Sequence, residues 1–89
     1  MKDVLINLRH ANSIEEFHHA FSPLGLPKDY GYNLDALHDV LTSISEPTHI
    51  TLKSLSNIDP SYTKIFMSMV QDAVVENKNL YIDLEEGED

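Results

Sequence analysis

The feature that most constrains the fold is the alternation of three short apolar segments with amphipathic helical segments. The apolar segments are 4–8, 49–53 and 80–84, and each has the length of a single strand. The first is almost continuously hydrophobic, so we expect it to be buried on both faces. Helical segments separate successive strands, and such crossovers join parallel strands. The sequence therefore predicts an α/β fold, a small three-stranded parallel sheet with helices packed on it, in the order β-α-α-β-α-β.

A local capping signal places the first helix after the first strand. Ser13 and Glu16 form a capping-box pattern, in which each side chain satisfies a backbone N–H at the start of a helix. Ile14, Phe17 and Phe21 follow at helical spacing, so we expect these three side chains on one buried face.

A longer helix is predicted between the last two strands. Asp59 is its expected N-cap, and Pro60 suits the first helical position. The predicted buried stripe of this helix consists of Tyr62, Ile65, Phe66, Met69, Val70 and Ala73.

The length of 89 residues suits one small domain, which we place at residues 1–84. Residues 85–89 are acidic and are predicted to form a frayed tail. The chain contains no cysteine, which excludes disulfides and thiolate metal sites. It also has no apolar run as long as a membrane span and no secretory hydrophobic segment. We therefore expect a cytoplasmic protein without a membrane partner.

The strongest bulk signal is negative charge. Fifteen acidic residues against six basic ones give a net charge of −9. Without the four carboxylates of residues 85–89, eleven acidic residues still stand against six basic ones. An acidic surface repels nucleic acids and anionic lipids, and it attracts basic proteins over long distances. The composition therefore favours a basic protein as the partner and disfavours nucleic acid.

The segment 30–42 contains the most specific pattern in the chain. Gly31 allows backbone conformations that most residues avoid, and Asn33 is a favourable N-cap. The helix that follows is predicted to run from Leu34 to about Ile44.

This predicted helix has one apolar and one acidic face. At about 100° per residue, Leu37 and Leu41 share the core face, whereas Asp35 and Asp39 lie on the opposite side. Two like charges four residues apart cost a helix roughly 0.2–0.5 kcal/mol. The acidic row is therefore either a solvated helix face or a surface made for a basic partner, and the pattern alone leaves both open.

The same segment resembles the signature helix of the barstar family, the intracellular inhibitors of the ribonuclease barnase. The resemblance is carried by Tyr30-Gly31, by Asn33-Leu34-Asp35-Ala36-Leu37, and by Asp39, Leu41 and Thr42. The order of elements extends it over almost the whole chain. It implies the sheet expected above and a protein that inhibits a small basic ribonuclease. It also implies an immunity or antitoxin role. The small size of the chain leaves no room for a deep cofactor cavity, so we expect no cofactor.

The resemblance further implies which residues contact the nuclease. Asp39 is expected to enter the active site where a substrate phosphate would sit, and Asp35 to meet the cationic rim beside it. A carboxylate suits this role because it accepts paired hydrogen bonds from arginine guanidinium groups. The other implied contact residues are Gly31, Asn33, Leu34, Thr42, Asp72 and Glu76.

Two positions depart from the family pattern. The family often has aromatic residues just before Tyr30 and just before Asp39, where this chain has Asp29 and His38. Both residues are kept as candidate contacts, and Tyr32 is a candidate to supply part of the missing aromatic area. The replacements favour a target ribonuclease whose rim differs in shape from that of barnase.

Two other classes of function remain open. One is an acidic interaction module that binds another basic protein without inhibiting a nuclease. The other is a metal protein in which Asp35, His38 and Asp39 share an ion, because an i,i+3 pair of carboxylate and imidazole is compatible with joint coordination. No phosphate-binding loop, zinc-protease motif or nucleophile elbow occurs, so the sequence does not predict catalysis.

Overall fold

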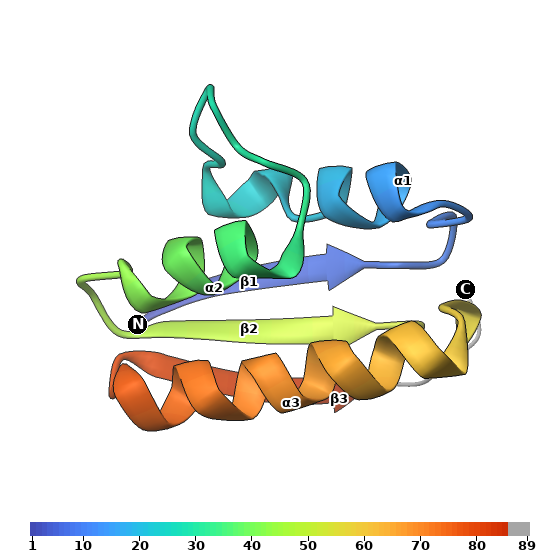
Figure 1. Ribbon diagram of the computed structural model, residues 1–89. Helices are drawn as coiled ribbons and strands as arrows, with labels where there is room; N and C mark the ends of the chain where they lie inside the picture. The colour runs from blue at the N-terminus through green and yellow to red at the C-terminus, as the bar shows by residue number, and fades with distance from the viewer. Residues whose placement is uncertain (86–89) are drawn as a thin grey trace.

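The computed structural model describes residues 1–85 and contains a three-stranded parallel sheet (Figure 1). Strand β2 (Thr48–Lys53) lies in the middle, between β1 (Lys2–Asn7) and β3 (Leu80–Glu85). Its register with β1 places Val4 opposite Ile50. The predicted fold class and the order β-α-α-β-α-β are confirmed.

Helices connect the strands and form one layer. Within the described residues they are α1 (Ile14–His19), η1 (Ser22–Leu24), α2 (Leu34–Thr42), η2 (Leu55–Asn57) and α3 (Pro60–Glu76). Figure 1 shows α2 in front of β1 and α3 in front of β3, so these helices cover the same face of the sheet.

The hydrophobic core lies between the sheet and this helical layer. The sheet contributes the buried side chains of Val4, Ile6, Ile50, Leu52 and Leu80. The helices and connections contribute Phe17, Phe21, Leu37, Leu41, Phe66 and Val70. Burial of one large apolar side chain is worth roughly 1.5–3 kcal/mol. Contact between the helices and one face of the sheet is therefore the main stabilising interaction.

Within residues 1–85, no helix covers the opposite face of the sheet (Figure 1). Leu5 and Tyr81 are 54% and 49% exposed on this face. The prediction that the first strand is buried on both faces is therefore wrong, because all the helices pack on one side. Polar groups bridge the strands instead, since His49 Nδ1 lies 3.0 Å from Asp3 Oδ1 and His49 Nε2 lies 2.7 Å from Asp83 Oδ2.

Two predicted core positions on helices are also wrong. Ile14 and Ile65 are 56% and 60% exposed. A helix on one face of a sheet buries only the residues directed at that sheet, so part of each apolar stripe stays outside. The other members of the two predicted stripes are buried or partly buried, namely Phe17, Phe21, Tyr62, Phe66, Met69, Val70 and Ala73.

The helix caps follow the predicted residues with two differences. Ser13 Oγ accepts a hydrogen bond from Glu16 N at 3.1 Å, as the capping box predicts. The Glu16 carboxylate, however, accepts from Asn12 N at 3.3 Å rather than from Ser13. Asp59 precedes α3 as predicted, but its side chain makes no capping hydrogen bond.

Element boundaries differ slightly from the expected ones. Helix α2 ends at Thr42, two residues before the expected end at Ile44. Glu85, which the sequence placed in the tail, is the last residue of β3, and the rest of the predicted tail, 86–89, lies outside the described residues. Within residues 1–85, no helix has the length and apolar character needed to cross a membrane.

Candidate partner-binding surface

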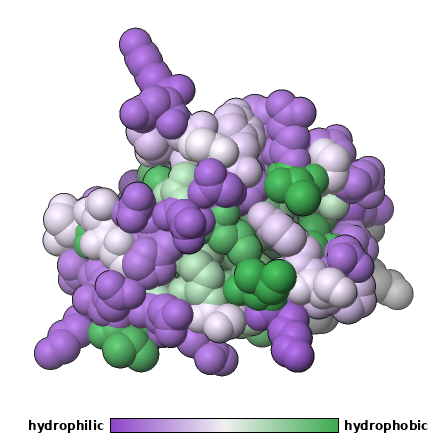
Figure 2. Space-filling view, viewed as in Figure 1, coloured by the Kyte–Doolittle hydropathy of each residue, from purple (hydrophilic) through white to green (hydrophobic). Residues whose placement is uncertain are grey.

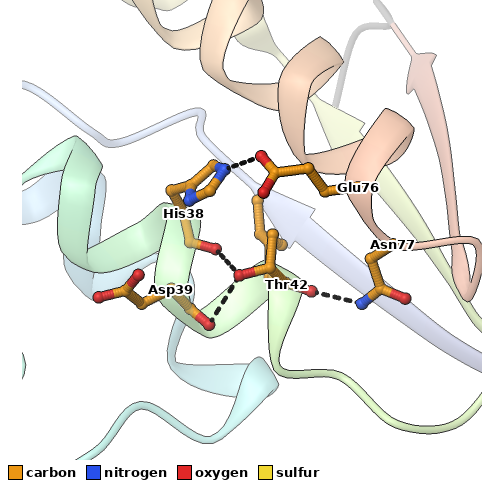
Figure 3. A network of polar contacts seen from close by, with 6 residues as sticks. His38, Asp39, Thr42, Glu76 and Asn77 are labelled. Atoms are coloured by element: carbon orange, nitrogen blue, oxygen red, sulfur yellow. Dashed lines mark hydrogen bonds and ion pairs between the residues drawn. The ribbon is translucent and has the colours of Figure 1, made fainter.

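The acidic face of α2 is exposed. Leu37 and Leu41 are buried beneath the helix, whereas Asp35 and Asp39 lie on its exposed side. Figure 3 shows the Asp39 carboxylate directed away from the imidazole of His38. Neither aspartate makes an ion pair within residues 1–85, so both charges are available to a partner.

A tight turn leads into α2. Asn33 Oδ1 accepts a hydrogen bond from Ala36 N at 2.8 Å, and Asn33 Nδ2 donates to Gly31 O at 3.1 Å. A Cβ at position 31 would lie 2.9 Å from Asn33 Nδ2, so a larger residue there would displace the side chain that caps α2. The left-handed residue of the turn is Tyr32, with a φ of 52°, and not Gly31 as the sequence indicated.

An open cleft of about 580 Å³ lies between this turn and α2. Partly buried apolar side chains line it, namely Leu24, Ala36, Val40 and Ile44. Three exposed acidic residues also line it, Asp29, Asp39 and Glu46, with Lys2 as a basic neighbour. Apolar area beside carboxylates fits a cationic side chain that has an aliphatic or planar body.

Hydrophilic side chains dominate the helical face of the molecule. Figure 2 shows this face as mainly hydrophilic, with smaller hydrophobic patches near its middle. A surface of this kind suits a polar interface better than the apolar contact of an obligate oligomer.

On the side of α2 that faces α3, His38 connects the two helices. Its Nε2 lies 2.8 Å from Glu76 Oε2 (Figure 3). Glu76 is exposed and is the last residue of α3. His38 and Glu76 are both candidate contacts from the sequence. They are 38 positions apart in the chain, and the tertiary structure brings them together.

Hydrogen bonds fasten the C-terminal end of α2. Asn77 Nδ2 donates to Leu41 O and to Ile44 O, both at 2.9 Å. The Thr42 hydroxyl donates to His38 O at 2.8 Å, so its proton is used within the helix (Figure 3). The helix that carries the acidic face is therefore fixed at its C-terminal end by Asn77, the residue after α3.

The remaining candidate contacts lie around this surface. Leu34 is partly buried and packs against the core from the first turn of α2. Asp72 is exposed on α3, one turn before Glu76. The ring of Tyr32 lies 4.9 Å from that of His19, so it is directed toward α1 rather than into the cleft.

Comparison with known proteins addresses the resemblance directly. A family model described as Barstar (barnase inhibitor) matches residues 1–85, which include every strand and helix from β1 to β3. The chain belongs to the barstar family. The resemblance inferred from residues 30–42 is thus confirmed, and the family description names an inhibitor of barnase. A search among curated proteins found no match.

This barstar-family chain does not gather metal ligands at the acidic helix. In the part of the chain that the structure describes, no three His, Asp or Glu side chains are placed to hold an ion. The His38 imidazole bonds to Glu76, away from the carboxylate of Asp39 (Figure 3). The trio of Asp35, His38 and Asp39 therefore does not converge on one point.

A buried histidine lies beneath the turn of this barstar-family protein. His18 is fully buried, with Nδ1 at 2.6 Å from Tyr30 Oη and Nε2 at 2.9 Å from Tyr62 Oη. Burial lowers the pKa of His18 and is the main cause that raises the pKa of Tyr30 and of Tyr62. The imidazole is therefore neutral at pH 7.

Sequence reasoning missed this histidine and much of the cleft. A signal for His18 was present, because it directly follows Phe17 and precedes Phe21 by three residues, within the buried stripe of the first helix. No comparable signal marked Leu24 and Val40, which come from separate segments and meet only in the folded chain.

Proposed function

We propose that this protein inhibits a small basic ribonuclease of the barnase type by covering its active site with α2 and the turn before it. The observation that carries the proposal is one cleft lined by Asp29, Asp39 and Glu46, in a chain that belongs to the barstar family. Asp35 adds a further exposed carboxylate one turn before Asp39 on the same helix.

Asp39 is the central residue of the proposal. A ribonuclease must gather cationic side chains around a phosphate, and a carboxylate offers those cations matching acceptors. Asp39 is exposed and free of ion pairs within residues 1–85, and its helix is capped by Asn33 and held by Asn77. A pre-ordered anion loses little conformational entropy on binding. Its occupation of the phosphate position would exclude RNA without any chemistry by the inhibitor.

The departures from the family pattern bear on which kind of nuclease we propose as the target. Asp29 lines the cleft, so it places a carboxylate where family members often have an aromatic ring. His38 orders Glu76 beside α2. Both changes favour a target with additional cations at the rim of its active site and a smaller apolar contact area.

The biological role that fits this activity is protection of a cell. In the cytoplasm, such an inhibitor would keep a nuclease silent before export, or would neutralise one delivered by a rival. This is the role of an immunity protein or antitoxin.

The first experiment is titration of RNA cleavage by a barnase-type ribonuclease with this protein. We expect stoichiometric inhibition. Asp39→Asn keeps the shape of the side chain and removes its charge, which leaves the cations of the nuclease unpaired in a closed interface. We expect the inhibition constant to rise at least ~30-fold in this variant.

Glu15→Gln is the matched control, because it removes one charge at an exposed position on α1 outside the cleft. It should leave inhibition nearly unchanged. Equal losses in the two variants would contradict the central role of Asp39. Tight binding of the nuclease with undiminished RNA cleavage would instead identify an acidic interaction module.

A further inference from the structure

His18 links the turn before α2 to two helices that do not line the cleft. It belongs to α1, and its two hydrogen-bond partners are Tyr62 on α3 and Tyr30 in the segment before α2. Of the three residues, only Tyr30 lines the cleft. Figure 1 shows the segment before α2 passing beside α1 on its way into the helix.

The two hydrogen bonds of His18 fix the orientation of both phenols. A neutral imidazole carries one N–H and one bare nitrogen, so one tyrosine must donate to the ring and the other must accept from it. His18 itself is fully buried, and its bond to Tyr30 lies in the core, whereas its bond to Tyr62 is partly buried. Loss of one phenol would leave a buried nitrogen unsatisfied, which native proteins rarely tolerate.

The turn needs support because it contains a residue in a disfavoured backbone region. Tyr32 has a φ of 52°, and such a conformation persists only when the surrounding structure enforces it. Its ring lies 5.3 Å from that of Tyr30 and 4.9 Å from that of His19. Tyr32 packs on the ring of Tyr30, so the hydrogen bonds that fix Tyr30 also support Tyr32.

We propose that His18 is a positioning residue for partner binding, whose bonds to Tyr30 and Tyr62 hold Gly31–Asn33 in the geometry that the partner recognises. The inference rests on the proposed function for the identity of the partner, whereas the order of the turn is a property of the free protein. A loop that occupies its binding geometry only part of the time binds with a dissociation constant raised in proportion.

Charging of His18 should release the same turn. The groups that face its ring are the hydroxyls of Tyr30 and Tyr62 and the rings of Phe17 and Tyr32, at 5.1 and 6.3 Å between ring centres. Its hydrogen-bond partners within residues 1–85 include no carboxylate, so an imidazolium would lack a counter-charge in the core. Burial already lowers the pKa of this group.

Tyr62→Phe tests the inference at a distance from the interface. It removes one hydroxyl on α3, keeps the ring that packs on Phe17, and changes no residue of the cleft. Tyr81→Phe makes the same change at an exposed tyrosine of β3 and serves as the matched control. At pH 7, with both variants shown to be folded by circular dichroism, we expect the dissociation constant for a barnase-type ribonuclease to rise about fivefold in Tyr62→Phe alone.

Amide hydrogen exchange in the free protein tests the turn without any nuclease. The N–H of Tyr30 donates to Pro27 O, and the N–H of Ala36 donates to Asn33 Oδ1. Both amides should exchange about fivefold faster in Tyr62→Phe, whereas the amide of Ile50 in the central strand should not change. Unchanged exchange at the turn would overturn the inference, and so would faster exchange with an unaltered dissociation constant. If the nuclease does not bind the unmodified protein, the proposed function is wrong. Amide exchange of Tyr30 and Ala36 then still tests whether His18 orders the turn.

The pH dependence gives a second readout. Between pH 7 and pH 5, the dissociation constant of the unmodified protein should rise more than that of His18→Phe, which lacks the titrating ring. All groups other than the His18 ring are common to both proteins, so their effects cancel in the comparison. If the dissociation constant rises by the same factor in both proteins, protonation of His18 does not release the turn. Tyr62→Phe keeps the inference testable if His18→Phe does not fold.

Discussion

At the scale of single residues, two histidines of this chain are shifted in opposite directions by their surroundings. Burial between two phenols lowers the pKa of His18. Hydrogen bonds that His49 donates to Asp83 and to Asp3, on the open face of the sheet, raise its pKa, and the bond to Asp83 contributes most. The residue type is the same, so the difference comes entirely from side chains that other elements supply.

His49 should stabilise the fold most below neutral pH. Because its pKa is raised in the folded chain, its contribution is fully present below the unfolded value of 6.5 and is lost as the pH rises through the folded value. Urea unfolding between pH 5 and pH 9 should show this loss in the unmodified protein and a flatter profile in His49→Gln. His10→Gln, at an exposed histidine, should keep the original profile. An unaltered slope in His49→Gln would show that the bridge to Asp3 and Asp83 does not stabilise the sheet.

At the scale of elements, α2 is a short helix whose two ends are fixed by asparagines. Asn33 caps its start, and Asn77 bonds to two carbonyls at its end. A helix of nine residues has little stability of its own, so its order depends on such caps and on packing. The rigidity of the acidic surface therefore depends on these caps and on the packing of α2 against α3.

Replacement of Asn77 by alanine should lower the free energy of unfolding by about 1–3 kcal/mol, because the carbonyls of Leu41 and Ile44 lose a donor in a poorly solvated position. Urea titration followed by circular dichroism measures this change. Asn12→Ala, at an exposed asparagine, should change stability by less than about 0.5 kcal/mol. Equal stability of the two variants would contradict the role assigned to Asn77 at the end of α2.

At the scale of the whole molecule, the net charge of −9 and the position of the carboxylates act together. Asp29, Asp39 and Glu46 line one cleft, and Asp35 and Glu76 lie nearby on α2 and α3. Such a concentration of one sign of charge attracts a basic protein before contact and orients its approach.

The rate of association with a basic ribonuclease should therefore fall at least ~10-fold between low salt and about 0.5 M salt. Stopped-flow fluorescence measures the association rate. Displacement of the bound protein from an immobilised nuclease measures the dissociation rate. Dissociation should change less, because a closed interface is screened weakly. An association rate that is independent of salt would contradict electrostatic steering.

The sequence by itself determined the features that depend on local chemistry. Ser13 and Asn33 are caps because each side chain reaches a backbone N–H three residues ahead. The alternation of strands with helices requires parallel crossovers, so the parallel direction of the three strands and the fold class followed. The run of residues 30–42 identified the family, which the match over residues 1–85 confirms.

The tertiary structure alone decided which predicted faces are covered and which separate residues meet. Leu5 and Ile65 belong to apolar patterns, yet they are exposed, because periodicity within one segment does not show whether another element packs on it. The bond of His18 to Tyr62 and the pair of His38 with Glu76 join residues that are 44 and 38 positions apart. Such contacts depend on how the helices lie on the sheet, and no single segment of the sequence contains that geometry.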